Sequence, residues 1–185
     1  MSAIPPNLEE ARAKGISLIS LPLGLDPNLR AVAPWLLGGV KSTSYAVNMA
    51  AEAEARRRGA DDAVFLASGD FVLEGPVTNV WWRRDDVLYT PALELGILAG
   101  VTRATLLAEA ATLGYEVREG AFPLAHLAAA DEAFTSSTVR EVLPVIQLDD
   151  APMGQGIPGD TAAQLHQALR RAAGPSSDPS FEGGG

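Results

Sequence analysis

Cysteine is absent from the 185-residue chain, which excludes disulfide bonds, thiolate nucleophiles and cysteine-ligated metals. Histidine is scarce, and His126 and His166 are 40 positions apart, so a histidine metal site is not expected either. No hydrophobic run approaches the roughly 18–20 residues that a membrane-spanning helix requires. The polar, proline-containing start of the chain is unlike a signal peptide. These absences predict a cytoplasmic protein with no metal centre and no membrane contact.

Positive charge is also in short supply, because 14 Lys and Arg residues stand against 23 Asp and Glu residues, a net charge of −9. A nucleic-acid interface needs a basic surface, so this balance argues against DNA or RNA as a partner. A hydrophobic fraction of 47% with 20% charged residues is typical of a globular protein. The length suits one ordinary domain with a real core.

Helix and strand patterns alternate along the chain. Helices are predicted over residues 45–59, 102–113 and 161–173, with a shorter helix between the last two and Thr102 as an N-cap. Strands are predicted over residues 15–23, 115–123, 132–137 and 141–148, with hairpins over 61–75 and 79–91. Because several strands follow one another through turns, we expect a mixed α/β (α+β) fold and not an all-parallel, doubly wound sheet.

Two aromatic residues stand next to each other in the second hairpin. Trp81 and Trp82 lie in the stretch "NVWWRRDDVLYTP", where strand alternation sends neighbouring side chains to opposite faces. We expect one ring to face the core and the other to cover the surface.

Lysine is as scarce as histidine, since only Lys14 and Lys41 accompany 12 arginines. Lys41 lies in "GGVKSTSYAVNMA", directly before a predicted helix. A lysine amine can form a Schiff base with an aldehyde, as in pyridoxal phosphate (PLP) attachment, whereas arginine cannot. An ordinary surface lysine is the alternative that composition alone favours.

Three further stretches contain groups that suit such a cofactor. In "VLEGPVTNV", Glu74 ends an apolar strand and Asn79 begins the next, so the carboxylate needs a partner: a protonated ring nitrogen, or Arg83 or Arg84. "GILAGVTR" places Val101 and Thr102 at a helix start, which suits a phosphate or simple capping. "TSSTVREV" clusters hydroxyl groups, which bind an oxyanion or form a plain turn.

The order of these motifs resembles that of the class IV PLP enzymes of fold type IV. Lysine, then "EGxxxN", then "GVTR", then "SST…EVxPV" extends over roughly residues 15–160. The family includes branched-chain and D-amino acid aminotransferases and 4-amino-4-deoxychorismate lyase. The resemblance implies that Lys41 binds PLP covalently and that Glu74 pairs with the pyridine nitrogen. It also implies phosphate contacts from Val101 and Thr102, a second phosphate contact from Ser137 and Thr138, and a place for Asn79 in the site.

The resemblance also implies a domain organisation. Residues 15–173 correspond to the PLP-binding large domain, with barrel-like mixed strands and flanking helices, and residues 1–14 to an interdomain segment. We expect the smaller N-terminal domain of the family to be missing from this sequence, since only 40 residues precede Lys41. Residues 174–185 are a low-complexity tail that we expect to be disordered. A tyrosine that many relatives carry five residues after the lysine is replaced by Ala46, with Tyr45 one position earlier.

Local similarity favours the lyase reaction. "PWLLGGVKSTSYAVNMA", "GADDAVF" and "VLEGP" resemble actinobacterial proteins described as aminodeoxychorismate lyases, which make 4-aminobenzoate and pyruvate for folate biosynthesis. A branched-chain or D-amino acid transaminase is the first alternative, and a non-catalytic remnant of the PLP fold is the second. The implied partners are a small substrate with an amino group and a second copy of the chain in a homodimer.

Overall fold

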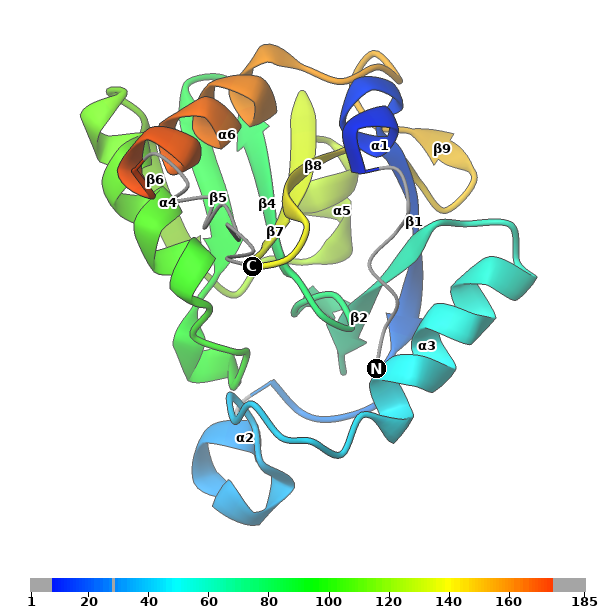
Figure 1. Cartoon of the computed structure of the whole chain (residues 1–185). Helices are drawn as coiled ribbons and strands as arrows, with labels where there is room; N and C mark the ends of the chain where they lie inside the picture. Colours follow the sequence, from blue (N-terminus) through cyan, green and yellow to red (C-terminus); the bar gives the residue numbers. More distant parts are fainter. Residues whose placement is uncertain (1–7, 28, 175–185) are drawn as a thin grey trace, which may run out of the picture.

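The computed structural model describes residues 8–27 and 29–174, whose strands form one curled, mixed sheet (Figure 1). The strand order is β3-β2-β1-β8-β7-β4-β5-β6, and a short β9 pairs with β8. The bounds are β1 Ile16–Pro22, β2 Asp62–Ala67, β3 Phe71–Val72, β4 Asn79–Arg84, β5 Val87–Pro91, β6 Glu116–Gly120, β7 Glu132–Ser137, β8 Glu141–Leu148 and β9 Ala151–Pro152. Strand β1 runs parallel to β2 and β8, and β5 parallel to β6, whereas the other pairs are antiparallel. The predicted mixed sheet is confirmed.

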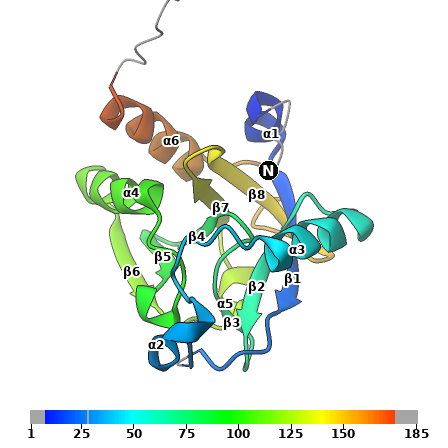
Figure 2. The same ribbon diagram turned by 60° about the horizontal axis from the view of Figure 1, so that its bottom comes forward.

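Helices cover the sheet on its outside and fill its curl. Their bounds are α1 Leu8–Lys14, α2 Leu29–Val32, α3 Ala46–Arg57, α4 Val101–Thr112, α5 Leu124–Ala128 and α6 Asp160–Ala172, with 3-10 turns η1 Pro34–Leu36 and η2 Leu93–Leu95. In Figure 2 the sheet curls between β6 and β1, and the short helix α5 lies between these two strands. The three long helices α3, α4 and α6 were all predicted from the sequence pattern.

Both faces of the central strand β4 are packed, which corrects the prediction for its tryptophans. Trp81 lies with residues of α4 and α6 in one hydrophobic cluster, and Trp82 lies in another on the opposite face, next to α5. Trp81 and Trp82 are both 0% exposed. Strand alternation was expected correctly, but a strand in the middle of a sheet that is covered on both sides has no solvent-facing ring.

The start of α4 also differs from expectation. Gly100 occupies the N-cap with extended backbone angles, and Val101 and Thr102 are the first two helical residues. The predicted N-cap at Thr102 is therefore wrong. Thr102 is 7% exposed because it already belongs to the buried side of the first turn.

Short elements near the start of the chain lacked a periodic pattern and were missed. Leu8 and Ala11 of α1 pack against the main core cluster, although residues 1–14 were expected to be an interdomain segment by resemblance. The domain boundaries themselves stay a prediction, and the predicted tail lies outside the described residues except for Gly174. Within the described ranges, no helix has the length and apolar character needed to cross a membrane.

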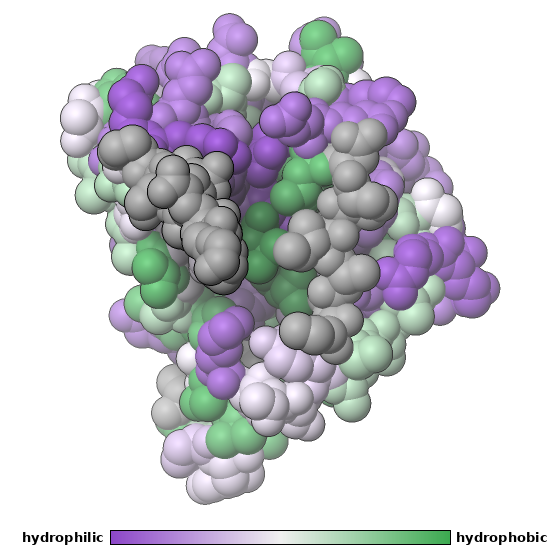
Figure 3. All heavy atoms as spheres, viewed as in Figure 1, coloured by the Kyte–Doolittle hydropathy of each residue, from purple (hydrophilic) through white to green (hydrophobic). Residues whose placement is uncertain are grey.

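Large hydrophobic side chains are exposed between α2 and the first half of α3. In Figure 3 hydrophobic residues are visible around the lower end of the molecule, where Figure 1 places α2. Val32 is 71% exposed and Trp35 is 77% exposed. Others in this stretch are Leu29, Leu37, Val40, Val47 and Met49. Clustered apolar surface of this kind is typical of a region that another domain or chain covers.

Candidate active site

The main chain of Leu98, between η2 and α4, is held by two of the predicted site residues. Its amide donates a hydrogen bond of 2.9 Å to Oε2 of Glu74, and its carbonyl accepts one of 2.9 Å from Nδ2 of Asn79. Glu74 follows β3 and Asn79 begins β4, so the two ends of one loop bind the same residue. Of the two arginines considered as alternative partners of Glu74, Arg83 and Arg84, Arg83 contacts Asp131 and Glu132.

The N-terminus of α4 lies directly after this bond pair. The first amides of a helix have no acceptor within the helix, and the N-cap Gly100 contributes no side-chain bond to them. A Cβ on Gly100 would lie 2.3 Å from Oδ1 of Asn79, so a glycine is required here for the loop to approach that side chain. Val101 is 78% exposed, which leaves this end of the helix open to solvent. The positive end of the helix dipole is therefore available to an anion.

The turn between β7 and β8 lies on the other side of Asn79. The β4–β7 register pairs Asn79 with Ser136, which places Ser137 beside the start of β4. Oγ of Ser137 accepts the amide of Arg140 at 3.1 Å, so the turn is closed by that serine and its O–H stays a donor. Thr138 is exposed at the turn. Ser136 does not close the turn. Its Oγ accepts a hydrogen bond of 2.9 Å from the indole N–H of Trp81.

Lys41 is exposed in the loop before α3, and the chain on both sides of the lysine lies against the same region. On one side, a Cβ on Gly39 would lie 3.0 Å from the carbonyl oxygen of Ile97, the neighbour of Leu98. On the other side, Nδ2 of Asn48 donates a hydrogen bond to the carbonyl of Pro76, within the loop that follows Glu74. The fold therefore brings the segment that carries Lys41 to the segments that carry Glu74 and α4.

Tyr45 is a residue of this region that the sequence did not assign. Its hydroxyl lies 3.4 Å from Nζ of Lys41. The contact was not predicted, because the family's tyrosine was expected five residues after the lysine and Tyr45 comes four residues after it. Tyr45 occupies the N-cap of α3, so its side chain turns back toward the loop that precedes the helix.

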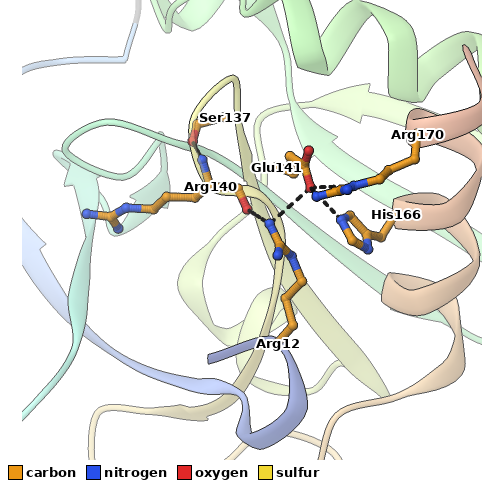
Figure 4. A network of polar contacts seen from close by, with 6 residues as sticks. All are labelled: Arg12, Ser137, Arg140, Glu141, His166 and Arg170. Atoms are coloured by element: carbon orange, nitrogen blue, oxygen red, sulfur yellow. Dashed lines mark hydrogen bonds and ion pairs between the residues drawn. The ribbon is translucent and has the colours of Figure 1, made fainter. Parts of the chain in front are cut away.

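Two charged networks hold the β7–β8 turn, and Figure 4 shows the one around Glu141. On one side, the carboxylate of Glu141 binds Arg12 of α1 together with His166 and Arg170 of α6. In Figure 4 the guanidinium group of Arg140 points away from this cluster. It pairs with Asp62 of β2 and Glu52 of α3, the helix that follows Lys41.

The partners of Arg140 are buried, with side-chain exposures of 1% for Asp62 and 10% for Glu52. Burial raises the pKa of Asp62, while the charge of Arg140 and the amide of Ala63 act in the opposite direction. Removing one partner of such a buried pair costs about 3–5 kcal/mol, because the other charge stays buried without compensation.

Glu141 should make stability depend on pH. Partial burial opposes its ionisation, but the hydrogen bonds from His166 and Arg170 and the charges of Arg170 and Arg12 lower its pKa below the ordinary value. A lowered carboxyl pKa contributes stability above the unfolded value of about 4.3, and that contribution disappears as pH falls through the folded value. We expect Glu141→Gln to lower the free energy of unfolding at pH 7 and to have progressively less effect between about pH 5 and pH 3.

Urea denaturation of both proteins at several pH values measures this difference. Glu116→Gln is the matched control, since Glu116 pairs with Arg118 on the surface and should give a small difference at every pH. A destabilisation by Glu141→Gln that is equal at pH 7 and pH 3 would contradict the assignment.

With the geometry in place, comparison with known proteins decides the family. Residues 1–148 match the family Amino-transferase class IV. The chain belongs to this family. Its relatives include the aminodeoxychorismate lyase of Bacillus subtilis, 36% identical over 115 residues that make up 62% of this chain and 39% of the relative. A D-alanine aminotransferase of Listeria monocytogenes is 38% identical over 133 residues, 72% of this chain and 46% of the relative.

Solved structures confirm the fold-type-IV architecture for this class IV family member. A fold IV transaminase from Curtobacterium pusillum superposes with a TM-score of 0.81 at 36% identity, over 89% of this chain and 56% of that one. The PLP-bound form of a hypothetical aminotransferase from Mycobacterium tuberculosis gives a TM-score of 0.83 at 31% identity, over 92% of this chain and 59% of that one. The chain thus spans less than half of the two curated relatives named above.

Proposed function

We propose that the chain binds pyridoxal phosphate at this site and acts as a 4-amino-4-deoxychorismate lyase. The observation that supports this most strongly is the pair of hydrogen bonds that join Leu98 to Glu74 and Asn79, directly before the N-terminus of α4. The groups present fit the cofactor chemically, since they comprise an accessible amine, a half-buried carboxylate, a helix N-terminus and a hydroxyl-bearing turn. The PLP-bound Mycobacterium tuberculosis structure with the same fold supports the same cofactor.

Each residue then has a role that follows from its position. The amides of Val101 and Thr102 and the Thr102 hydroxyl bind the phosphate, and Ser137 and Thr138 add a contact from the turn. The Glu74 carboxylate, already fixed by the Leu98 amide, keeps a proton on the ring nitrogen. Asn79 holds the carbonyl of Leu98 and so orients the loop that begins α4.

Lys41 carries the covalent chemistry. The bound cofactor supplies an electron sink for the substrate carbon that bears the amino group. Nζ of Lys41 would hold the cofactor covalently and, when free, would take the proton from that carbon as a general base. The Tyr45 hydroxyl lies close enough to Nζ to orient it.

The lyase reaction is proposed for two reasons: the local similarity of residues 34–50, 59–65 and 72–76 to lyases, and the relative in Bacillus subtilis. Loss of the enolpyruvyl ether as pyruvate, with aromatisation of the ring, gives 4-aminobenzoate. Transamination by a branched-chain or D-amino acid enzyme is the alternative that the Listeria relative supports. A non-catalytic remnant of the PLP fold is the second alternative.

Pyruvate release separates these functions. The purified chain, saturated with PLP and given 4-amino-4-deoxychorismate but no keto acid, should release pyruvate, which lactate dehydrogenase coupling detects. A strict requirement for a keto-acid acceptor would instead establish a transaminase. A chain that binds PLP but neither releases pyruvate from 4-amino-4-deoxychorismate nor transfers an amino group from a branched-chain or D-amino acid to a keto acid would support the non-catalytic alternative.

The assembly and location belong to the same proposal. A cytoplasmic homodimer with a small amino substrate follows from the family resemblance, and the exposed hydrophobic side chains between α2 and α3 are compatible with a second copy. Both the dimer and the location stay predictions.

A further inference from the structure

Three groups of one residue, Arg140, hold the β7–β8 turn in place: its amide, its carbonyl and its guanidinium group. The amide of Arg140 donates to Oγ of Ser137 at 3.1 Å, and its carbonyl accepts a hydrogen bond of 3.1 Å from Arg12 of α1. Its guanidinium group pairs with Asp62 and Glu52. The neighbouring residue, Glu141, has a left-handed φ of 56°, which is uncommon outside glycine and persists only where the surroundings determine it. The backbone of this turn is therefore held by contacts and not by its own preference.

The carboxylates that bind Arg140 come from elements that lead to the rest of the site. Glu52 belongs to α3, which begins five residues after Lys41, and Asp62 begins β2, whose hairpin partner β3 leads to Glu74. One guanidinium group can bridge two carboxylates at once, whereas a lysine ammonium group on a flexible stem offers no fork. The bridge thus connects the turn with both the lysine helix and the glutamate hairpin.

We propose that Arg140 is a positioning residue for the phosphate contact: its pairing with Asp62 and Glu52 holds the Ser137–Thr138 turn opposite the N-terminus of α4. Arg140 acts through Ser137 and does not itself contact the cofactor. The inference rests on the proposed PLP binding, and it predicts a loss that depends on the phosphate group of the ligand.

The test compares PLP with pyridoxal, which has the same aldehyde and ring but no phosphate. Dissociation constants are measured by absorbance titration for the wild type, Arg140→Met and Arg140→Lys. Arg140→Met should weaken PLP binding about tenfold, the size expected for a misplaced hydrogen bond to a charged group. Binding of pyridoxal should change by less than about twofold. The dissociation constant of Arg140→Lys for PLP should lie between those of the wild type and Arg140→Met.

Two further variants control for instability and for loss of charge. Asp62→Asn combined with Arg140→Met removes the more deeply buried of the two carboxylates that lose Arg140 in the single variant, so it should recover part of the stability but not PLP affinity. Arg118→Met removes an arginine from the exposed pair with Glu116 and should change neither affinity. Thermal unfolding of each variant shows which of them are folded at the titration temperature.

The outcomes separate the inference from the proposal on which it rests. Equal weakening of PLP and pyridoxal by Arg140→Met, or full recovery of PLP affinity in the double variant, would overturn the role of Arg140 while leaving PLP binding intact. A wild-type chain that binds neither ligand would overturn the proposed function, and the inference with it.

Discussion

Replacing Lys41 with alanine should abolish the covalent PLP complex and lower pyruvate release by about a thousandfold or more. The reason is that one amine is proposed both to attach the cofactor and to move the substrate proton, and a general base alone contributes about 10²–10⁴ in rate. The absorbance of the protein–PLP complex and the coupled pyruvate assay measure the two effects separately.

Lys41→Arg distinguishes this chemistry from a simple need for positive charge. Arginine keeps the charge and much of the length but forms no Schiff base, so it should fail as completely as alanine. Lys14→Arg is the matched control, because Lys14 lies on α1 in a surface pair with Glu10. Retention of the yellow complex in Lys41→Arg would mean that another group holds the cofactor.

Replacing Glu74 with glutamine should lower the turnover number by about a hundredfold while the covalent complex still forms. Glutamine can still accept the Leu98 amide, so the local structure stays, but its neutral amide cannot hold a proton on the ring nitrogen. Removing one preorganised electrostatic contact in an active site costs about 10²–10³ in rate. Steady-state kinetics at saturating PLP measures the effect.

Glu94→Gln serves as the control for Glu74, since Glu94 is an exposed acid in η2, four residues before Leu98. It should leave turnover unchanged. If Glu74→Gln lowers PLP affinity and turnover no more than Glu94→Gln does, the carboxylate has only the structural task of binding the Leu98 amide.

Local chemistry made much of the fold and site predictable. The long helices ended at glycines or arginine-rich turns, and the hairpins turned at Ser68-Gly69-Asp70 and Asp85-Asp86, so their pattern could be read without tertiary contacts. Lys41, Glu74 and the hydroxyl cluster stood out because each is an unusual residue type for its local context. Their approach in space follows from the strand register and from the loop that Leu98 anchors.

The remaining features depend on contacts between distant segments. Both tryptophans of β4 are buried because helices pack on each face, which a single strand cannot reveal. The pairing of Arg140 with Asp62 joins residues 78 positions apart, so no spacing rule points to it. The N-cap of α4 was predicted two positions too late, at Thr102, because threonine is a common capping residue, whereas Gly100 occupies the N-cap in the structure.

The most direct test of the site is chemical trapping of its lysine. The wild-type chain is incubated with PLP, reduced with borohydride and digested, and the peptides are weighed by mass spectrometry. The chain has only two lysines, so Lys14 is an internal reference for non-specific reaction. We expect the pyridoxyl group on the Lys41 peptide at close to one per chain and almost none on the Lys14 peptide. Equal labelling of both lysines, or an unlabelled Lys41, would contradict the assignment of this site.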